Sequence, residues 1–270
     1  MDADTQARGG FWQRLRGLRW PGMAAASPAP VPPPGQRIYA VGDIHGRADL
    51  LDRLHALIVE DAARAPQGTA CRIVYLGDYV DRGPDSAGVI ARLIAGPPPG
   101  WSAVHLRGNH DAALLAFLRD AAYLRIWGTF GGLQTLASYG VAPPSAGAGI
   151  DALEEARAAL EARLPASHRA FLEATEAMHV VGGLVFVHAG LRPGLPLSDQ
   201  VEDDLLWIRE PFLSSPRSHG KLVVHGHSPS ELVEILPNRV GVDTGAYATG
   251  VLSAVVFDGG PLRILDTRPR

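Results

Sequence analysis

The sequence predicts an α/β fold in which two packed β-sheets are flanked by helices. Between residues 37 and 106, short apolar runs alternate with segments of helical periodicity, which is typical of βαβ units and of a mainly parallel sheet. After residue 180, short strands follow one another with turns and without helices between most of them. The 270 residues can bury a substantial core, and no run reaches the roughly 18 apolar residues of a membrane-spanning helix.

Residues 1–36 are expected to form a disordered tail and a proline-rich linker. They carry four arginines against two aspartates, and five prolines fall between residues 28 and 34, which favours an extended chain. Residues 11–20 mix aromatic side chains with arginines, a composition compatible with an amphipathic segment on an anionic membrane. Three glycines in and just before this segment weaken any helix, so we expect a disordered tail rather than peripheral membrane contact.

Three buried strands linked by helices are expected next. The strands are apolar runs that each end at a glycine or a polar cluster, at 37–41, 72–76 and 103–106. Helical spacing of apolar side chains lies between them, at Leu50, Leu51, Leu54, Leu57 and Ile58 and again at Val89, Ile90, Leu93 and Ile94. A further helix is expected from about residue 111.

The middle of the chain, residues 112–178, is predicted to be a mostly helical insertion beside the sheet. Leu153, Ala156 and Leu160 recur at helical spacing within it. The remaining strands are predicted at 180–187, 221–225, 232–236, 239–242, 251–257 and 262–265. Strands linked first by helices and later by turns lead to two packed sheets with the helices outside.

Composition and charge exclude several classes of function. The formal net charge of -3 argues against a dedicated nucleic-acid binder, because such proteins usually carry a strong basic excess. The single cysteine, Cys71, excludes an internal disulfide framework and favours a reducing compartment, so a cytoplasmic location is expected. Of the 25 basic residues only Lys221 is a lysine, which genomic base composition explains for most of the arginines.

Five polar clusters each follow an apolar strand directly. They are Gly-Asp-Ile-His-Gly at 42–46, Gly-Asp-Tyr-Val-Asp-Arg-Gly at 77–83, Gly-Asn-His-Asp at 108–111, His-Ala-Gly at 188–190 and His-Gly-His-Ser at 225–228. In an open α/β sheet, ligands bind beyond the carboxyl ends of the strands. We therefore expect all five clusters to converge on one rim of the molecule.

The residue types in these clusters indicate metal binding. Asp43 and His45 stand two residues apart and point to the same side of an extended chain, and Asp78 has two oxygens with which to bridge two cations. Asn109 and two histidines supply neutral ligands for a second position. This mixture without thiolates suits Mn, Fe or Zn. Two such metals would hold and deprotonate a water for in-line attack on phosphorus.

The order of these motifs resembles that of the metallophosphoesterases. The Gly-Asp-Tyr-Val-Asp-Arg-Gly form is similar to the phosphoprotein-phosphatase family of serine/threonine phosphatases, in its bacterial and phage branch. The resemblance covers about residues 37–260 and implies a single metallophosphoesterase domain over 37–270. It also implies a calcineurin-like four-layer sandwich, in which two mixed β-sheets are flanked by helices.

The resemblance implies a dinuclear metal site. By matching position, the first metal would be held by Asp43, His45 and Asp78. The second would be held by Asp78, Asn109, His188 and His227. Members of the family commonly contain Mn, or Fe together with Zn. His225 is the other histidine of its motif, but the pattern places the ligand at His227, and Asp243 is expected to brace a turn or a histidine nearby.

Two further groups are implied by the same resemblance. His110 resembles the residue that protonates the leaving oxygen, and Asp81 resembles the carboxylate that orients its imidazole. Arg82, Arg107 and Arg209 fall where the family places phosphate-binding arginines, whose planar fork can hold two phosphate oxygens. For these three arginines, we expect a phosphate-binding role in place of the explanation from genomic base composition.

The functional hypothesis is a metal-dependent phosphomonoesterase, foremost a protein serine/threonine phosphatase acting on a phosphoprotein or a small phosphoester. One alternative is a symmetrical dinucleoside-tetraphosphatase or another small-molecule phosphohydrolase, because Asp111 stands where protein phosphatases usually have glutamate. Asp81 instead favours a protein phosphatase, since the symmetrical dinucleoside-tetraphosphatases typically lack this aspartate. An alternative of another class is a non-catalytic module that binds metal or phosphate. The sequence indicates no oligomeric state.

Overall fold

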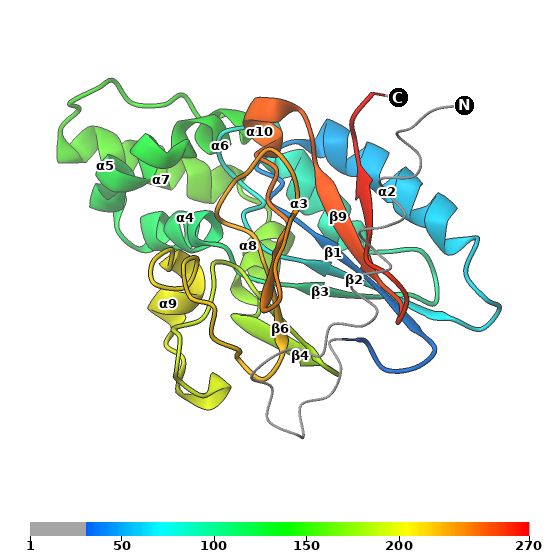
Figure 1. Ribbon diagram of the computed structural model, residues 1–270. Helices are drawn as coiled ribbons and strands as arrows, with labels where there is room; N and C mark the ends of the chain where they lie inside the picture. The colour runs from blue at the N-terminus through cyan, green and yellow to red at the C-terminus, as the bar shows by residue number, and fades with distance from the viewer. Residues whose placement is uncertain (1–30, 270) are drawn as a thin grey trace.

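The computed structural model describes residues 31–269, which form two mixed five-stranded sheets flanked by helices (Figure 1). This arrangement confirms the α/β fold class expected from the sequence. Most of the predicted tail, including the segment 11–20, lies outside the described residues.

The first sheet joins the helix-linked strands to the end of the chain. Its order is β10 (Arg263–Asp266), β9 (Ser253–Phe257), β1 (Gln36–Val41), β2 (Ala70–Tyr75) and β3 (Ser102–His105). Strands β1, β2 and β3 are parallel, whereas β9 runs antiparallel to β1 and β10 antiparallel to β9. Val41 pairs with Tyr75, and Tyr75 with His105. The three parallel strands therefore end level, and the loops that follow them start at one edge.

The second sheet also contains three parallel strands, but its edges differ from those of the first sheet. Its order is β4 (Met178–Val181), β5 (Leu184–Val187), β6 (Leu222–His225), β8 (Arg239–Gly241) and β7 (Glu234–Ile235). Strands β5, β6 and β8 are parallel, with an antiparallel strand at each edge. The prediction of one strand over 180–187 is wrong, because Gly182 and Gly183 form a turn and Gly182 has a φ of 56°. Glycine adopts this conformation without a steric penalty, so the segment folds as a hairpin.

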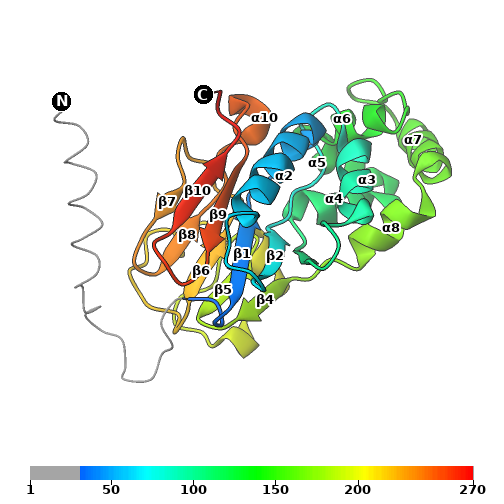
Figure 2. The same cartoon turned by 90° about the vertical axis from the view of Figure 1, so that its right-hand side faces the viewer.

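Helices cover the outer faces of the sheets. They are α2 (Ala48–Ala62), α3 (Ser86–Ala95), α4 (Asn109–Arg119), α5 (Leu124–Trp127), α6 (Gly132–Ser138), α7 (Ile150–Arg163), α8 (Ala166–Glu173), α9 (Glu202–Trp207) and α10 (Ala246–Thr249). Figure 2 shows α2 lying along the first sheet, with the green helices of the middle segment gathered on the same side of the molecule. Within residues 31–269, no helix combines the length and apolarity needed to cross a membrane.

Alternate side chains of the strands serve two different cores. On β1, Tyr39 and Val41 face the core that the sheet shares with the helices, whereas Ile38 and Ala40 face the second sheet. The core between the sheets includes Phe186 of β5. A strand that is buried on both faces has apolar side chains at successive positions. For this reason, apolar and polar residues do not alternate along residues 38–41 of β1. The sheets thus form a packed double layer, and the polar loops emerge at its rim.

Candidate metal centre and active site

The five motif loops meet at the carboxyl ends of the parallel strands, as predicted. The backbone of the loop after β1 is tied to the loop after β2 by His45 N–H, which donates to the Asp78 carbonyl at 2.8 Å. Asp43 accepts from the backbone N–H of His227 at 3.0 Å, which links the two sheets. A Cβ at Gly226 would lie 2.1 Å from Asp43 Oδ1, so only glycine allows this close approach.

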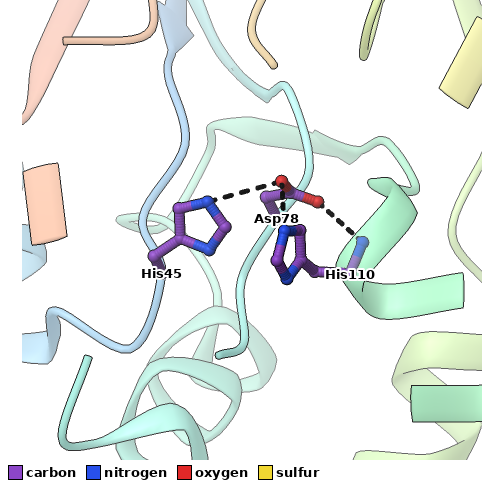
Figure 3. Close-up of side chains that lie close together, drawn as sticks. All are labelled: His45, Asp78 and His110. Carbon is purple, nitrogen blue, oxygen red and sulfur yellow. Dashed lines mark hydrogen bonds and ion pairs between the residues drawn. The ribbon is translucent and has the colours of Figure 1, made fainter. Parts of the chain in front are cut away.

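Two groups of buried side chains in this region could each hold a metal ion. One consists of His45, Asp78 and His110, and the other of Asp78, His188 and His227, with the ligand atoms of each group within 4.8 Å of one another. Figure 3 shows the side chains of His45 and His110 close to the Asp78 carboxylate, which interacts with both residues. Asp78 belongs to both groups, as expected for a bridging ligand.

The other predicted ligands lie next to these groups. Asn109 Oδ1 is 2.9 Å from His188 Nε2 and 3.0 Å from His227 Nδ1, so the predicted second set converges on one point. Asp43 is not a member of the first group, and its carboxylate accepts from the backbone N–H of His227, a residue of the second group. The structure places His110 within the first group. The sequence analysis instead predicts that His110 is the proton donor and not a metal ligand.

The imidazoles are prepared for ligation by their other nitrogen. His45 Nδ1 lies 2.9 Å from the Val80 carbonyl and His188 Nδ1 lies 2.8 Å from the Leu76 carbonyl. Since a carbonyl only accepts, Nδ1 carries the proton in both rings and Nε2 is left with its lone pair. Burial lowers the pKa of His45 and of His227 to about 3, which keeps both neutral and able to bind metal.

Buried carboxylates crowd the same space. Burial, with the neighbouring charges of Asp243 and Asp78, raises the pKa of Asp43 well above its usual range. Burial likewise raises the pKa of Asp243 to about 6. Bringing several carboxylates together in a buried site is costly unless a cation compensates their charge. Neutral imidazoles, an amide oxygen and crowded carboxylates therefore form a donor set that fits a pair of metal ions.

The backbone of the site is strained. Five non-glycine residues of the described chain have a positive φ, between 46° and 74°, and all five are predicted site residues: His45, Asp78, Asp81, Arg82 and His227. Such conformations cost roughly 1–3 kcal/mol each and persist where the surroundings over-determine them. Their concentration at the rim indicates that the fold stores strain where it orients functional groups.

His110 and Asp81 form the predicted pair. His110 Nδ1 lies 2.7 Å from Asp81 Oδ2, and His110 Nε2 accepts from Arg82 at 3.0 Å. Burial opposes the charged imidazole, but the carboxylates of Asp78 and Asp81 outweigh it and raise the pKa of His110. Arg82 also donates to His45 Nε2 at 3.1 Å, so its guanidinium spans both rings at the metal groups.

The other two predicted arginines are placed differently. Arg209 is near the second group, where it donates to Ser228 Oγ at 3.2 Å, one residue beyond His227. Arg107 donates to Thr175 Oγ1 at 3.0 Å and to the carbonyls of Glu173 and Thr175, and it pairs with Glu202. The structure does not bring the Arg107 guanidinium into either histidine group, and its phosphate-binding role stays a prediction.

Three residues near the site have supporting contacts. His225 donates from Nδ1 to the Gly226 carbonyl at 3.0 Å and packs edge-on against Phe212, away from the ligand groups. Asp243 accepts from Gly245 N–H at 2.8 Å, the turn-bracing role that the sequence suggested. Asp111 is fully buried and accepts from the backbone N–H groups of Gly108, Asp78 and Tyr79.

Sequence reasoning missed the aromatic side chains around the site. Tyr247 lies edge-on to His45 at 5.4 Å and under the Arg82 guanidinium at 4.7 Å. Trp207 lies 6.3 Å from the His227 ring and 5.8 Å from Phe130. The residues Tyr247 and Trp207 are 40% and 37% exposed. Trp207 stands two residues before Arg209, and this proximity was the only signal available in the sequence.

Comparison with known proteins identifies the family. The model of the calcineurin-like phosphoesterases matches residues 36–255. The chain belongs to this family. It is therefore a metallophosphoesterase, a hydrolase of phosphoesters, and the two groups that share Asp78 correspond to the dinuclear site typical of the family.

Two relatives carry related names. A symmetrical bis(5'-nucleosyl)-tetraphosphatase of Acidovorax sp. (strain JS42) is 44% identical over 79 residues, which are 29% of this chain and 25% of that protein. The asymmetrical bis(5'-nucleosyl)-tetraphosphatase PrpE of Anoxybacillus flavithermus is 27% identical over 237 residues, 80% of this chain and 89% of that protein. The first match thus spans about a quarter of the relative's length.

Solved structures share the fold. A putative diadenosine tetraphosphatase superposes with a TM-score of 0.59 at 24% identity, over 87% of this chain and 96% of that one. A mutant cold-active protein tyrosine phosphatase gives a TM-score of 0.54 at 15% identity, over 86% of this chain and 79% of that one. At these identities the likeness concerns the fold, which is common to proteins with different substrates.

Proposed function

We propose that this metallophosphoesterase hydrolyses dinucleoside polyphosphates, with a dinucleoside tetraphosphate as the representative substrate. The names of the two sequence relatives support this substrate class. The observation that carries the proposal is the series of aromatic and arginine side chains beside the metal groups, Tyr247, Arg82, Phe130 and Trp207. A substrate with bases and several phosphates can use both kinds of side chain.

The metal ligands are proposed as the sequence predicted them. Asp43, His45 and Asp78 would hold one ion, and Asp78, Asn109, His188 and His227 the other. Metal ions bound there lower the pKa of a water and neutralise charge on the phosphoryl oxygens. The protein contributes a buried, fixed donor set, because the His45 and His188 rings are each oriented by a backbone carbonyl.

His110, Asp81 and Arg82 act on the substrate side of the reaction. Asp81 fixes the tautomer in which His110 Nδ1 is protonated, and its charge favours a second proton at Nε2. We propose that this Nε2 proton goes to the leaving oxygen as the bond to phosphorus breaks. In the neutral ring, Nε2 accepts from the Arg82 guanidinium. A proton on Nε2 releases this contact, and Arg82 can then bind phosphoryl oxygens with two N–H groups.

The exposed rings at the rim provide surfaces for bases. Base stacking on an aromatic face contributes about 1–3 kcal/mol per base, and every base can use it. Trp207 adjoins the His227 side of the site and Tyr247 adjoins the His45 side. Both remain more than one-third exposed and so can still cover a ligand.

A second candidate is the protein serine/threonine phosphatase that the motifs resemble. The specific observation in its favour is the short Asp81–His110 contact of 2.7 Å, since Asp81 belongs to the motif form of the protein phosphatases. A phosphoserine substrate has an alkoxide leaving group that needs a proton, and this pair can deliver one.

The test is a substrate panel on protein whose metal content has been measured. Diadenosine tetraphosphate, a phosphoserine peptide and 4-nitrophenyl phosphate are compared by kcat/KM. We expect the dinucleotide to be preferred by at least about tenfold over the peptide, as stacking of one base would give. Preference for the peptide would overturn the proposal in favour of the protein phosphatase. Separation of the nucleotide products would show whether cleavage is symmetrical.

A further inference from the structure

One segment of the helical middle part is directed at the predicted proton-donor pair. This segment, residues 127–135, runs from the end of α5 to the first turns of α6 and is called the clamp segment below. Arg82 N–H donates to the Gly131 carbonyl at 3.2 Å, and Arg82 Nε is 3.4 Å from the Phe130 carbonyl. Asp81 N–H is 2.9 Å from Thr135 Oγ1. The motif resemblance gave this segment no role.

The Asp81 carboxylate is held by three donors, one from α4 and two from the clamp segment. Oδ2 receives His110 Nδ1–H at 2.7 Å and Trp127 Nε1–H at 2.8 Å, while Oδ1 receives the Thr135 hydroxyl at 2.6 Å. Asp81, Trp127 and Thr135 are fully buried. Water therefore does not compete for these bonds, and each one fixes the plane of the carboxylate.

The direction of the His110 bond follows from the other ring nitrogen. Arg82 is always a donor, so His110 Nε2 must offer a lone pair to it in this arrangement. The proton of the neutral ring then lies on Nδ1 and points to Asp81. The plane of the Asp81 carboxylate consequently sets the plane of the imidazole, and with it the direction of Nε2.

Two glycines allow the clamp segment to approach this closely. Gly131 has a φ of 105°, and a Cβ there would lie 2.7 Å from Arg82 N. A Cβ at Gly132 would lie 2.4 Å from the Trp127 ring. Any larger residue at either position would push the segment away from Asp81.

We propose that the clamp segment is the positioning element for His110, and that Trp127 and Thr135 orient its imidazole by fixing the Asp81 carboxylate. The terminal torsion of aspartate is broad and roughly two-fold, so a carboxylate without such donors rotates easily. Trp127 and Thr135 touch neither the leaving oxygen nor the metal groups and are positioning residues. The inference rests on the proposed role of His110 as proton donor.

The experiment compares substrates that differ in their need for a proton. Phenyl phosphate has a poor leaving group, whereas 2,4-dinitrophenyl phosphate leaves without protonation. Thr135→Val keeps the shape and removes the hydroxyl. We expect kcat for phenyl phosphate to fall about tenfold, part of the 10²–10⁴-fold that general acid catalysis supplies, and kcat for the dinitrophenyl ester to change less than about twofold. Thr135→Ser should restore both values.

Controls separate positioning from loss of fold. Thr267→Val removes another buried hydroxyl, which contacts Leu252 N–H and the Gly250 carbonyl, and should leave the ratio of the two rates unchanged. Trp127→Phe removes the second donor to the Asp81 carboxylate independently. It should lower the ratio of kcat for phenyl phosphate to kcat for 2,4-dinitrophenyl phosphate. In an Asp81→Ala background, Thr135→Val should leave the ratio of the two rates unchanged, because the carboxylate through which Thr135 orients His110 is absent.

A spectroscopic measurement provides a readout without turnover. The Nδ1 proton of His110 in the short bond to Asp81 should give a far-downfield proton resonance, which Thr135→Val should shift and broaden while Thr267→Val leaves it in place. An equal fall in both rates, or an unchanged resonance with unchanged rates, would overturn the proposal. If His110→Asn itself shows no leaving-group dependence, the proton-donor role fails. If the loss of kcat depends on the leaving group in His110→Asn but not in Thr135→Val, His110 keeps its role as proton donor and only the positioning role of the clamp segment is rejected.

Discussion

The two sheets contribute to the same site in different ways. Loops of the first sheet carry four of the five positive-φ residues in the described chain, His45, Asp78, Asp81 and Arg82, whereas the second sheet contributes His227. The first-sheet loops are also tied to one another, since His45 N–H binds the Asp78 carbonyl and His110 N–H binds Asp78 Oδ1. Strain held in place by many bonds is typical of groups whose orientation matters to the reaction.

On the second-sheet side, the predicted phosphate-binding arginine has few contacts. The Arg209 side chain has one hydrogen bond among the described contacts, to Ser228 Oγ at 3.2 Å. Exposed side chains with few partners can adjust to a ligand at little cost. The difference suggests that the fixed groups of the first-sheet loops determine how fast any phosphoester is cleaved, and that Arg209 on the second-sheet side contributes mainly to substrate binding.

Among the substitutions considered, removing the bridging carboxylate should have the largest effect on turnover, because it affects both sides of the site. Asp78 belongs to both metal-binding groups, so Asp78→Asn takes away one negative charge from each. We expect the variant to bind less than half of the metal and to lose about a thousandfold or more in kcat on every substrate, since metal ions contribute several kcal/mol to such reactions. Metal analysis with steady-state rates provides the check. A metal-replete variant with near-normal kcat would contradict the bridging role.

Much of the site could be predicted because its residues follow strands directly. The loops at Asp43, Asp78 and Asn109 begin where parallel strands end level, and the sequence shows both the apolar run and the polar cluster. Parallel pairing then brings together residues that are far apart in sequence. The same reasoning predicted the two sheets, because strand spacing carries information about how strands are connected.

What the sequence could not show depends on packing between distant elements. Trp127 and Thr135 are ordinary buried residues in a helical segment, and only the structure brings them to Asp81. Arg107 matched a phosphate-binding position, yet its guanidinium is engaged by Thr175 and Glu202. Side-chain direction depends on which acceptors are within reach, and a motif does not encode it.

Arginine substitutions on the two sides should separate turnover from recognition. Arg82→Ala removes a donor beside His110 Nε2 and should lower kcat on all substrates. Arg209→Ala should instead raise KM by roughly 10–100-fold for the dinucleotide, the worth of a charge-assisted hydrogen bond, and leave kcat within about threefold. Arg268→Ala, at an exposed surface position, is the control. Equal effects of both variants on kcat would mean that the two sides do not differ in role.

The smallest effect is expected at Asp111, the position where the sequence hinted at substrate class. Its carboxylate is fully buried and bonds only to the backbone N–H groups of Gly108, Asp78 and Tyr79 among the described contacts. Asp111→Glu adds a methylene to this packed space and should destabilise the fold by about 1–3 kcal/mol, as overpacking does. Because the side chain does not face the rim, the kcat/KM ratio of dinucleotide to phosphopeptide should stay within about twofold. Thermal unfolding and the substrate panel measure the two effects. A change in the kcat/KM ratio at unchanged stability would show that the first-sheet side also selects substrates.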